Sequence, residues 1–140
     1  MALKASRIDT WAATIKDQPG GLSAKLETLA AAKVNLEFII ARRAPDKPGT
    51  GVVFVTPISG AAGLAAAKRA GFKRTASLHT VRVEGPDKAG QAARVSAALA
   101  EVGVNLRGFS AAAIGKKFIA HMAVDTSAAA AKAMKIIAKL

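Results

Sequence analysis

The sequence predicts an α+β protein built from two similar units, each with the element order βαββαβ and an antiparallel sheet covered by helices on one face. Three observations support this prediction. The 140 residues are 51% hydrophobic, so the chain can bury a core. Short segments in which apolar residues alternate are separated by alanine-rich segments with helical periodicity. The second half of the sequence repeats the order of the first half.

The internal repeat has an offset of 70 residues and needs no gap. Asp17 and Asp87 each open a short turn that contains glycine, and the two are 70 residues apart. Asn35 and Asn105 each stand in the tripeptide Val-Asn-Leu, again 70 residues apart. The matching residues lie at turns and at element boundaries, where the backbone restricts the choice of residue. We therefore expect the two units to share one topology.

The first unit is expected at residues 1–70, with its fourth strand just beyond. The expected elements are a strand at 8–15, a helix at 22–33, strands at 34–40 and 51–56, a helix at 61–70 and a strand at 72–77. Gly71 follows the second helix in the position that favours a left-handed backbone. In the core we expect Trp11, Leu22, Leu26, Leu29, Leu36 and Phe38.

The second unit, expected at residues 71–140, repeats this order. Its expected elements are strands at 78–84, 104–113 and 117–125, a helix at 91–102, and a last helix that ends at residue 140 and is capped by Thr126 or Ser127. This order is the ferredoxin-like pattern, but a fourth strand is missing. We expect the N-terminal strand at 2–7 to complete the sheet of the second unit. Core residues expected there are Val81, Val83, Leu99, Val102, Leu106 and Met134.

The charge is strongly basic, with 21 Lys and Arg against 9 Asp and Glu and a net charge of +12. Such a balance is typical either of a solvated surface or of a protein with an anionic partner such as nucleic acid. The basic residues are scattered in pairs, and aromatic residues make up only 4% of the chain. Few side chains are thus available to stack on bases. Nucleic-acid binding by a ferredoxin-like module remains the alternative function.

Other classes of function have little support in the sequence. The chain has no cysteine, and its N-terminus lacks the apolar stretch of a secretion signal. Its longest apolar runs are shorter than the roughly 18 residues typical of a membrane span. We therefore expect a cytoplasmic protein that does not bind membranes. His79 and His121 are the only histidines, and no acid pair or activated nucleophile is evident. We expect no enzyme activity, metal or cofactor.

The turn before the first helix combines residues that suit a small anionic group. It reads Asp17, Gln18, Pro19, Gly20, Gly21 and Leu22. Proline fixes one backbone angle, and the two glycines allow a ligand to approach the backbone closely. The free N–H groups at the start of the helix favour a carboxylate or a phosphate. Asn35 adds an amide that both donates and accepts hydrogen bonds.

This combination of a Pro-Gly turn, an amphipathic helix and a Val-Asn-Leu strand resembles the ACT domain, a small ligand-binding regulatory module. Since two copies fill nearly all of the chain, the protein resembles tandem ACT proteins without an attached enzyme. The resemblance implies ACT-like units that pair through their sheets into a homodimer or a larger homo-oligomer. It also implies an amino acid bound at the interface of units, and a regulated protein partner. In the first unit the resemblance assigns Asp17 to Leu22 and Asn35 to the ligand site.

The second unit matches this pattern less closely. Its corresponding ligand residues are Asp87, Lys88, Gly90 and Asn105, but Ala89 replaces the proline. The bound ligand itself is not specified by these residues. The glycines are also explained by the demands of the turn, and the asparagines by hydrogen bonds to nearby backbone. The aspartates are likewise explained as turn or capping residues.

Overall fold

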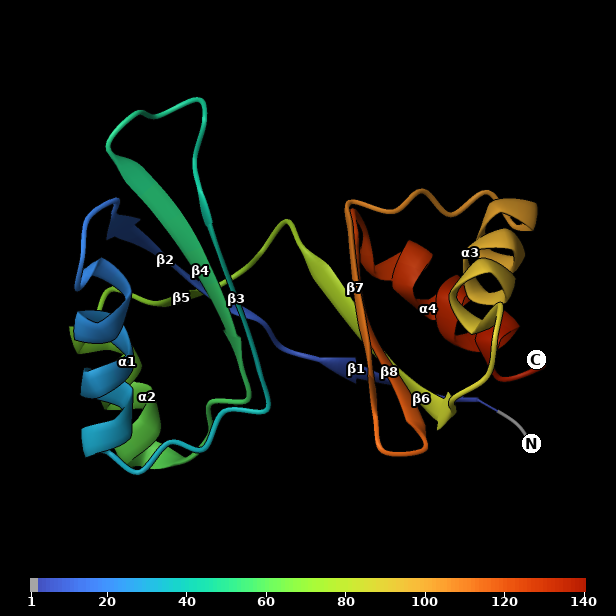
Figure 1. The fold of residues 1–140 in the computed structure, drawn as a ribbon, viewed down its shortest axis with the longest axis horizontal. Coiled ribbons are helices and arrows are strands. Elements are labelled where there is room, and N and C mark those ends of the chain that lie inside the picture. The colour runs from blue at the N-terminus through green and yellow to red at the C-terminus, as the bar shows by residue number, and fades with distance from the viewer. Residues whose placement is uncertain (1–2) are drawn as a thin grey trace. The chain divides into compact units, whose positions relative to one another are not determined.

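The computed structural model describes residues 3–140, and its internal contacts divide the chain into two compact units (Figure 1). Residues 9–75 form the N-terminal unit. Residues 76–140 form the C-terminal unit together with the N-terminal segment up to Ile8. Within the described residues, no helix is long and apolar enough to cross a membrane.

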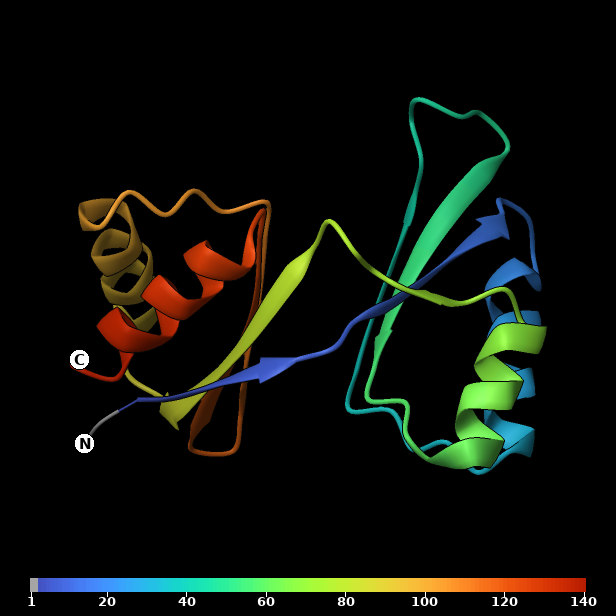
Figure 2. The ribbon, with the colours of Figure 1, turned by 180° about the vertical axis from the view of Figure 1, so that it is seen from behind.

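The N-terminal unit is a four-stranded antiparallel sheet in the order β3-β4-β2-β5, with two helices on one face (Figure 2). Its elements are β2 (Trp11–Lys16), α1 (Gly21–Ala31), β3 (Phe38–Arg43), β4 (Thr50–Thr56), α2 (Gly60–Arg69) and β5 (Lys73–Arg74). Gly71 follows α2 with φ +84°, and its N–H donates to the carbonyl of Lys68. The left-handed end predicted for this helix is therefore confirmed.

The C-terminal unit has the same architecture, with strand order β1-β6-β8-β7. Its elements are β1 (Lys4–Ile8), β6 (His79–Pro86), α3 (Gln91–Glu101), β7 (Gly108–Ile114), β8 (Lys117–Val124) and α4 (Ser127–Ile137). β1 pairs antiparallel with β6, from Lys4 opposite Glu84 to Ile8 opposite Thr80. The α+β class and the two ferredoxin-like units predicted from the sequence are confirmed.

The boundaries of the compact units differ from a division at residue 70. Residues 71–75 lie with the N-terminal unit because Phe72 is buried in its core and Arg74 pairs with Trp11. The strand expected at 8–15 is two strands, interrupted at Asp9 and Thr10. The carbonyls of these two residues accept hydrogen bonds from the hydroxyl of Thr56 and the N–H of Thr75.

The strand expected at 34–40 is displaced along the chain, since β3 begins only at Phe38 and continues to Arg43. The N–H of Val34 still bonds back to the carbonyl of Leu29 at the end of α1. Val34 and Leu36 lie in the connection between α1 and β3, and their side chains pack against the core. The alternation of apolar residues therefore begins before the strand does. The strand then continues through Arg42 and Arg43, which pair with Val52 and Gly51.

The repeat does contain a gap, in the hairpin of each unit. Trp11 and Val81 are 70 residues apart, but their partners on the next strand, Val55 and Met122, are 67 apart. The connection between β7 and β8 is therefore three residues shorter than the connection between β3 and β4. The prediction of a repeat without gaps is wrong for the elements that follow these connections, because the identical residues mark turns and do not show how long the connections are.

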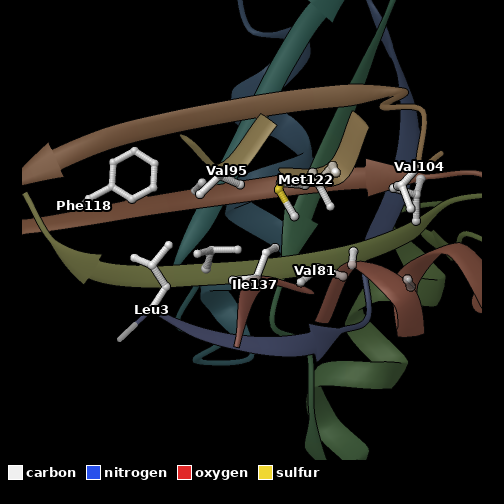
Figure 3. Packing of buried hydrophobic residues seen from close by; sticks show 13 residues of the cluster. Leu3, Val81, Val95, Val104, Phe118, Met122 and Ile137 are labelled. Atoms are coloured by element: carbon white, nitrogen blue, oxygen red, sulfur yellow. The ribbon is translucent and has the colours of Figure 1, made fainter. Parts of the chain in front are cut away.

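Each unit has its own core between its sheet and its helices. In the C-terminal unit, Leu3 of the N-terminal segment packs with residues of β6, β8, α3 and α4 (Figure 3). Of the expected core residues, Leu29, Val81, Val83 and Leu99 are fully buried. The others are half-buried against the two cores, with one exception. Phe38 pairs with Thr56 on the face of the sheet away from the helices, so its assignment to the core is wrong.

Candidate functional site

The connection between β2 and α1 has a backbone that requires glycine at two consecutive positions. Gly20 adopts φ +85° at the N-cap of α1, in the left-handed region that side chains disfavour. Gly21 packs so tightly that a Cβ atom would overlap the carbonyl oxygen of Lys16. Both glycines are thus explained by the turn itself, and the turn brings the start of α1 against the end of β2.

Hydrogen bonds hold this turn in place. The N–H of Asp17 donates to the carbonyl of Gly49 in the β3–β4 hairpin at 3.0 Å. The N–H of Gly21 donates to the carbonyl of Gln18 at 3.0 Å. No side chain caps the N-terminus of α1, and its first turn contains no acidic residue. The N–H groups that follow Gly21 in the first turn of the helix thus have no side-chain cap and can donate to an anion from outside.

A pocket of about 190 Å³ lies beside this turn. Its lining comes from the end of β2, the turn, the start of α1 and the ends of β3 and β4. The lining residues are Ile15, Lys16, Asp17, Gln18, Leu22, Ala41, Arg42, Arg43 and Gly51. Sites for drug-sized ligands measure roughly 300–1,000 Å³, so this pocket suits a smaller molecule.

One ion pair bridges the pocket from the hairpin to the turn. The Nε of Arg43 lies 2.9 Å from the Oδ2 of Asp17. The guanidinium side chain is 81% exposed and the aspartate side chain 35% exposed, so both charges remain accessible from solvent. A positive and a negative group therefore stand side by side at the entrance to a partly apolar pocket.

The structure brings together most of the ligand residues predicted for the first unit. Asp17, Gln18 and Leu22 line the pocket, and Pro19, Gly20 and Gly21 form the adjoining turn. Asn35 does not line it. This residue follows the C-terminal end of α1, and 11 helical residues at about 1.5 Å each put roughly 16 Å between the two ends of the helix.

Sequence reasoning missed the contribution of the hairpin. Arg43 and Gly51 lie outside the Pro-Gly turn, and Arg43 lies beyond the predicted end of its strand at residue 40. The pair Arg42-Arg43 was visible in the sequence only as one of several basic pairs. The signal that identifies it is strand register, because Gly51 pairs with both Ile15 and Arg43.

In the C-terminal unit the equivalent turn has a similar backbone but different surroundings. Gly90 caps α3 with φ +83°, and Asp87 donates its N–H to the carbonyl of Lys116 at 2.9 Å. Asp87, Lys88 and Gly90 are exposed, as is Asn105 beyond the other end of α3. Gln91 replaces the second glycine, and its side-chain amide donates to the carbonyl of Pro86 at 2.8 Å.

The positions that correspond to the pocket carry different residues in the C-terminal unit. Ile15 pairs with Gly51 in one unit, and Gly85 pairs with Phe118 in the other. Phe118 is only 6% exposed and belongs to the core, where Leu3 packs directly over Gly85. The large residue lies on the first strand of the N-terminal unit, as Ile15, but on the hairpin strand of the C-terminal unit, as Phe118. Phe118 therefore stands at the position that corresponds to Gly51.

Residues 3–140 contain no group of three or more His, Asp or Glu side chains that could hold a metal ion. The His79 ring nitrogen Nδ1 instead lies 3.1 Å from the Nη2 of Arg7.

Comparison with protein families finds a match within the C-terminal unit. Residues 79–140 match the family model described as the ACT domain. The N-terminal unit has the same strand order and helix placement as the matched unit, and its turn before α1 carries the Pro-Gly sequence on which the resemblance to ACT domains rests. In sequence, no curated protein matches the chain at a significant level.

Solved structures share the whole tandem ACT-like fold. Protein BT0572 from Bacteroides thetaiotaomicron superposes with a TM-score of 0.78 at 16% identity, covering 94% of this chain and 88% of that one. The ligand-free regulatory subunit of aspartate kinase from Thermus thermophilus superposes with a TM-score of 0.66 at 16% identity, covering 99% and 96%. At such low identity these similarities establish the fold.

Proposed function

We propose that this chain is a regulatory protein that binds a free amino acid beside the start of α1 and catalyses no reaction itself. The observation that carries the proposal is the pocket of about 190 Å³, with an accessible ion pair next to an uncapped helix start. The match of residues 79–140 to the ACT domain model and the fold shared with a regulatory subunit of aspartate kinase support a regulatory role.

The chemistry of the pocket suits a free amino acid. The turn residues Asp17 to Leu22 lead into the start of α1, which has no side-chain cap. The N–H groups at this helix start favour a carboxylate. Charge-assisted hydrogen bonds to a carboxylate are among the stronger polar contacts available to a small ligand. In the C-terminal unit, Asp87, Lys88 and Gly90 keep a proposed but weaker role, because Phe118 stands where Gly51 leaves space. Asn35 and Asn105 remain predictions that this pocket does not include.

Regulation would follow from differential affinity. A ligand shifts the equilibrium between two states of a protein only by as much as its affinity for them differs. In this proposal the amino acid favours one arrangement of the turn and the hairpin. The readout is then a second copy of the chain or a regulated partner protein that contacts this arrangement.

A thermal-shift screen of the twenty L-amino acids tests the proposal directly. An amino acid that binds the folded chain raises the melting temperature by mass action. Calorimetry then gives its Kd. If every amino acid leaves the melting temperature and the heat of mixing unchanged, the proposal is wrong. A rise with DNA or RNA instead would favour the nucleic-acid alternative.

Two matched glycine variants locate the site. Gly20→Ala and Gly90→Ala each place a side chain at φ near +84° and are expected to destabilise their units equally, by about 1–2 kcal/mol. Only Gly20→Ala should weaken amino-acid binding, because only Gly20 adjoins the pocket. Equal loss of affinity in both variants would place the ligand elsewhere.

A further inference from the structure

Strand register shows which side chains face the pocket. Gly51 pairs with Ile15 on one side and with Arg43 on the other, so these three residues share the helix-covered face of the sheet. Lys16 and Arg42 are the next residues along their strands and therefore have side chains on the opposite face. The carbonyl oxygen of Lys16 lies against Gly21, and that of Arg42 lies against Gly51.

The side chains that face the pocket therefore carry one positive and one negative charge, Arg43 and Asp17. The three basic residues in the lining, Lys16, Arg42 and Arg43, would suggest a site for an anion. The side chains of Lys16 and Arg42, however, lie on the face of the sheet away from the pocket. What remains is a pair of opposite charges 2.9 Å apart, with Ile15, Leu22 and Ala41 providing the apolar part of the lining.

We infer that Arg43 binds the α-carboxylate and Asp17 the α-ammonium of a small amino acid with an uncharged side chain. This inference rests on the proposed function and adds the ligand class and a binding residue. The poles of the zwitterion match the two charges, and the apolar lining excludes a charged side chain because burial of an unpaired charge is costly. The small volume of the pocket excludes large side chains.

The existing ion pair is no obstacle to this binding. Exposed ion pairs contribute little to stability, because solvent screens them and their side chains lose freedom in forming them. The ligand replaces one contact between guanidinium and carboxylate by two charge-assisted contacts of the same kind. The bound ligand thus replaces the direct contact between Arg43 of the hairpin and Asp17 of the turn. The positions of both elements then depend on whether the ligand is bound.

Among residues 3–140 this combination of side chains occurs once. Arg43 corresponds to Ala113, which pairs with Phe118 as Arg43 pairs with Gly51. The C-terminal unit keeps Asp87 but has no guanidinium at the matching position. Phe118 replaces Gly51 opposite Gly85, and Leu3 packs over Gly85. The ligand stoichiometry should be one per chain, although the chain contains two similar units.

The test is calorimetry on the full chain with glycine, L-alanine, L-serine, L-threonine and L-valine, and with L-lysine and L-glutamate as charged comparisons.

The variant is Arg43→Gln, and Arg42→Gln is the matched control, because it removes the same charge from the neighbouring residue on the other face. We expect one site per chain for an uncharged amino acid. Arg43→Gln should weaken binding by about tenfold or more, and Arg42→Gln by less than about twofold. The methyl ester of the tightest ligand, which lacks the carboxylate, should bind Arg43→Gln and the unaltered chain alike.

The outcomes separate the inference from the proposed function. If no amino acid binds the unaltered chain, both are wrong. If one binds but Arg43→Gln has unchanged affinity, or two ligands bind per chain, or a charged amino acid binds tightest, the inference alone is wrong. Because the Arg43 side chain is 81% exposed, its replacement should leave the fold intact, which circular dichroism checks.

Discussion

Lys33 is the one residue other than glycine among residues 3–140 that has a positive φ, at +60°. It ends α1 in the same way that Gly103 ends α3 at φ +74°, and in both units the next N–H bonds back to a leucine carbonyl. A side chain in this left-handed conformation is strained, so Lys33→Gly should stabilise the N-terminal unit by about 1 kcal/mol. Urea unfolding measures the change.

The reverse substitution in the other unit is the control for this prediction. Gly103→Lys should destabilise the C-terminal unit by about 1 kcal/mol, because it introduces the strain that Lys33→Gly removes. A loss of stability in Lys33→Gly would show that the lysine side chain contributes more than its backbone costs.

We expect His121 to make the stability of the C-terminal unit sensitive to acid. It lies in β8 opposite Arg82 and Ser110, and Arg82 in turn is paired with Glu84 at 2.6 Å. Burial, and secondarily the charge of Arg82, lower the pKa of His121 from 6.5 to about 4. Between these two values the unfolded chain binds a proton that the folded chain does not. Stability should therefore fall as the pH falls from about 6.5 to about 4, by up to about 3 kcal/mol.

The variant that tests this contribution is suggested by the repeat. His121 corresponds to Phe54 in the N-terminal unit, since each pairs with the middle of the neighbouring strand in equivalent register. His121→Phe should remove most of the loss of stability between pH 6.5 and 4.5, whereas His79→Gln should leave it in place. Urea unfolding at the two pH values gives both results. An unchanged pH dependence in His121→Phe would refute the assignment.

At the scale of elements, β1 is the strand whose place depends most on distant sequence. Leu3, which immediately precedes β1, is 3% exposed, packs over Gly85 and belongs to the core of the C-terminal unit (Figure 3). Leu3→Ala should destabilise this unit by about 2–5 kcal/mol, because it leaves a cavity in a packed core. Hydrogen exchange should show faster opening in residues 76–140 and no change in residues 9–75.

A second variant separates packing from general effects of the N-terminal segment. Lys4→Ala removes the exposed side chain of the first residue of β1, next to Leu3, and should leave hydrogen exchange nearly unchanged. If both variants open the C-terminal unit equally, or neither does, the role of Leu3 in its core is smaller than its burial indicates.

Helices were the elements that the sequence predicted best. Their observed ends lie within about three residues of the predicted ones, because glycine turns and capping residues mark them. Thr126, for example, accepts the N–H of Ala129 at 3.0 Å, as expected of a helix cap. β3 was predicted poorly. It is an edge strand whose extent depends on pairing with β4, and pairing is not visible in local alternation.

For the whole molecule, the repeat predicted the architecture but not every position within it. Elements before each hairpin match at 70 residues and elements after it at 67, so counting alone misplaces residues such as Phe118 and His121. The candidate site was predicted where one continuous turn contains it, from Asp17 to Leu22. Arg43 and Gly51 were missed because strand pairing, and not sequence proximity, brings them to the turn.

The pairing of β1 with β6 has a consequence for synthesis on the ribosome. β1 leaves the ribosome first, but its partner strand follows only after the whole of residues 9–75. Since domains generally fold as units while the chain is still growing, the unit with the pocket completes its sheet first, and β1 waits without a partner. The nascent chain therefore completes the unit that carries the candidate pocket before residues 79–140, which match the ACT domain model, have been synthesised. If the proposed amino acid binds this pocket, its binding can begin during translation, before the second unit has folded.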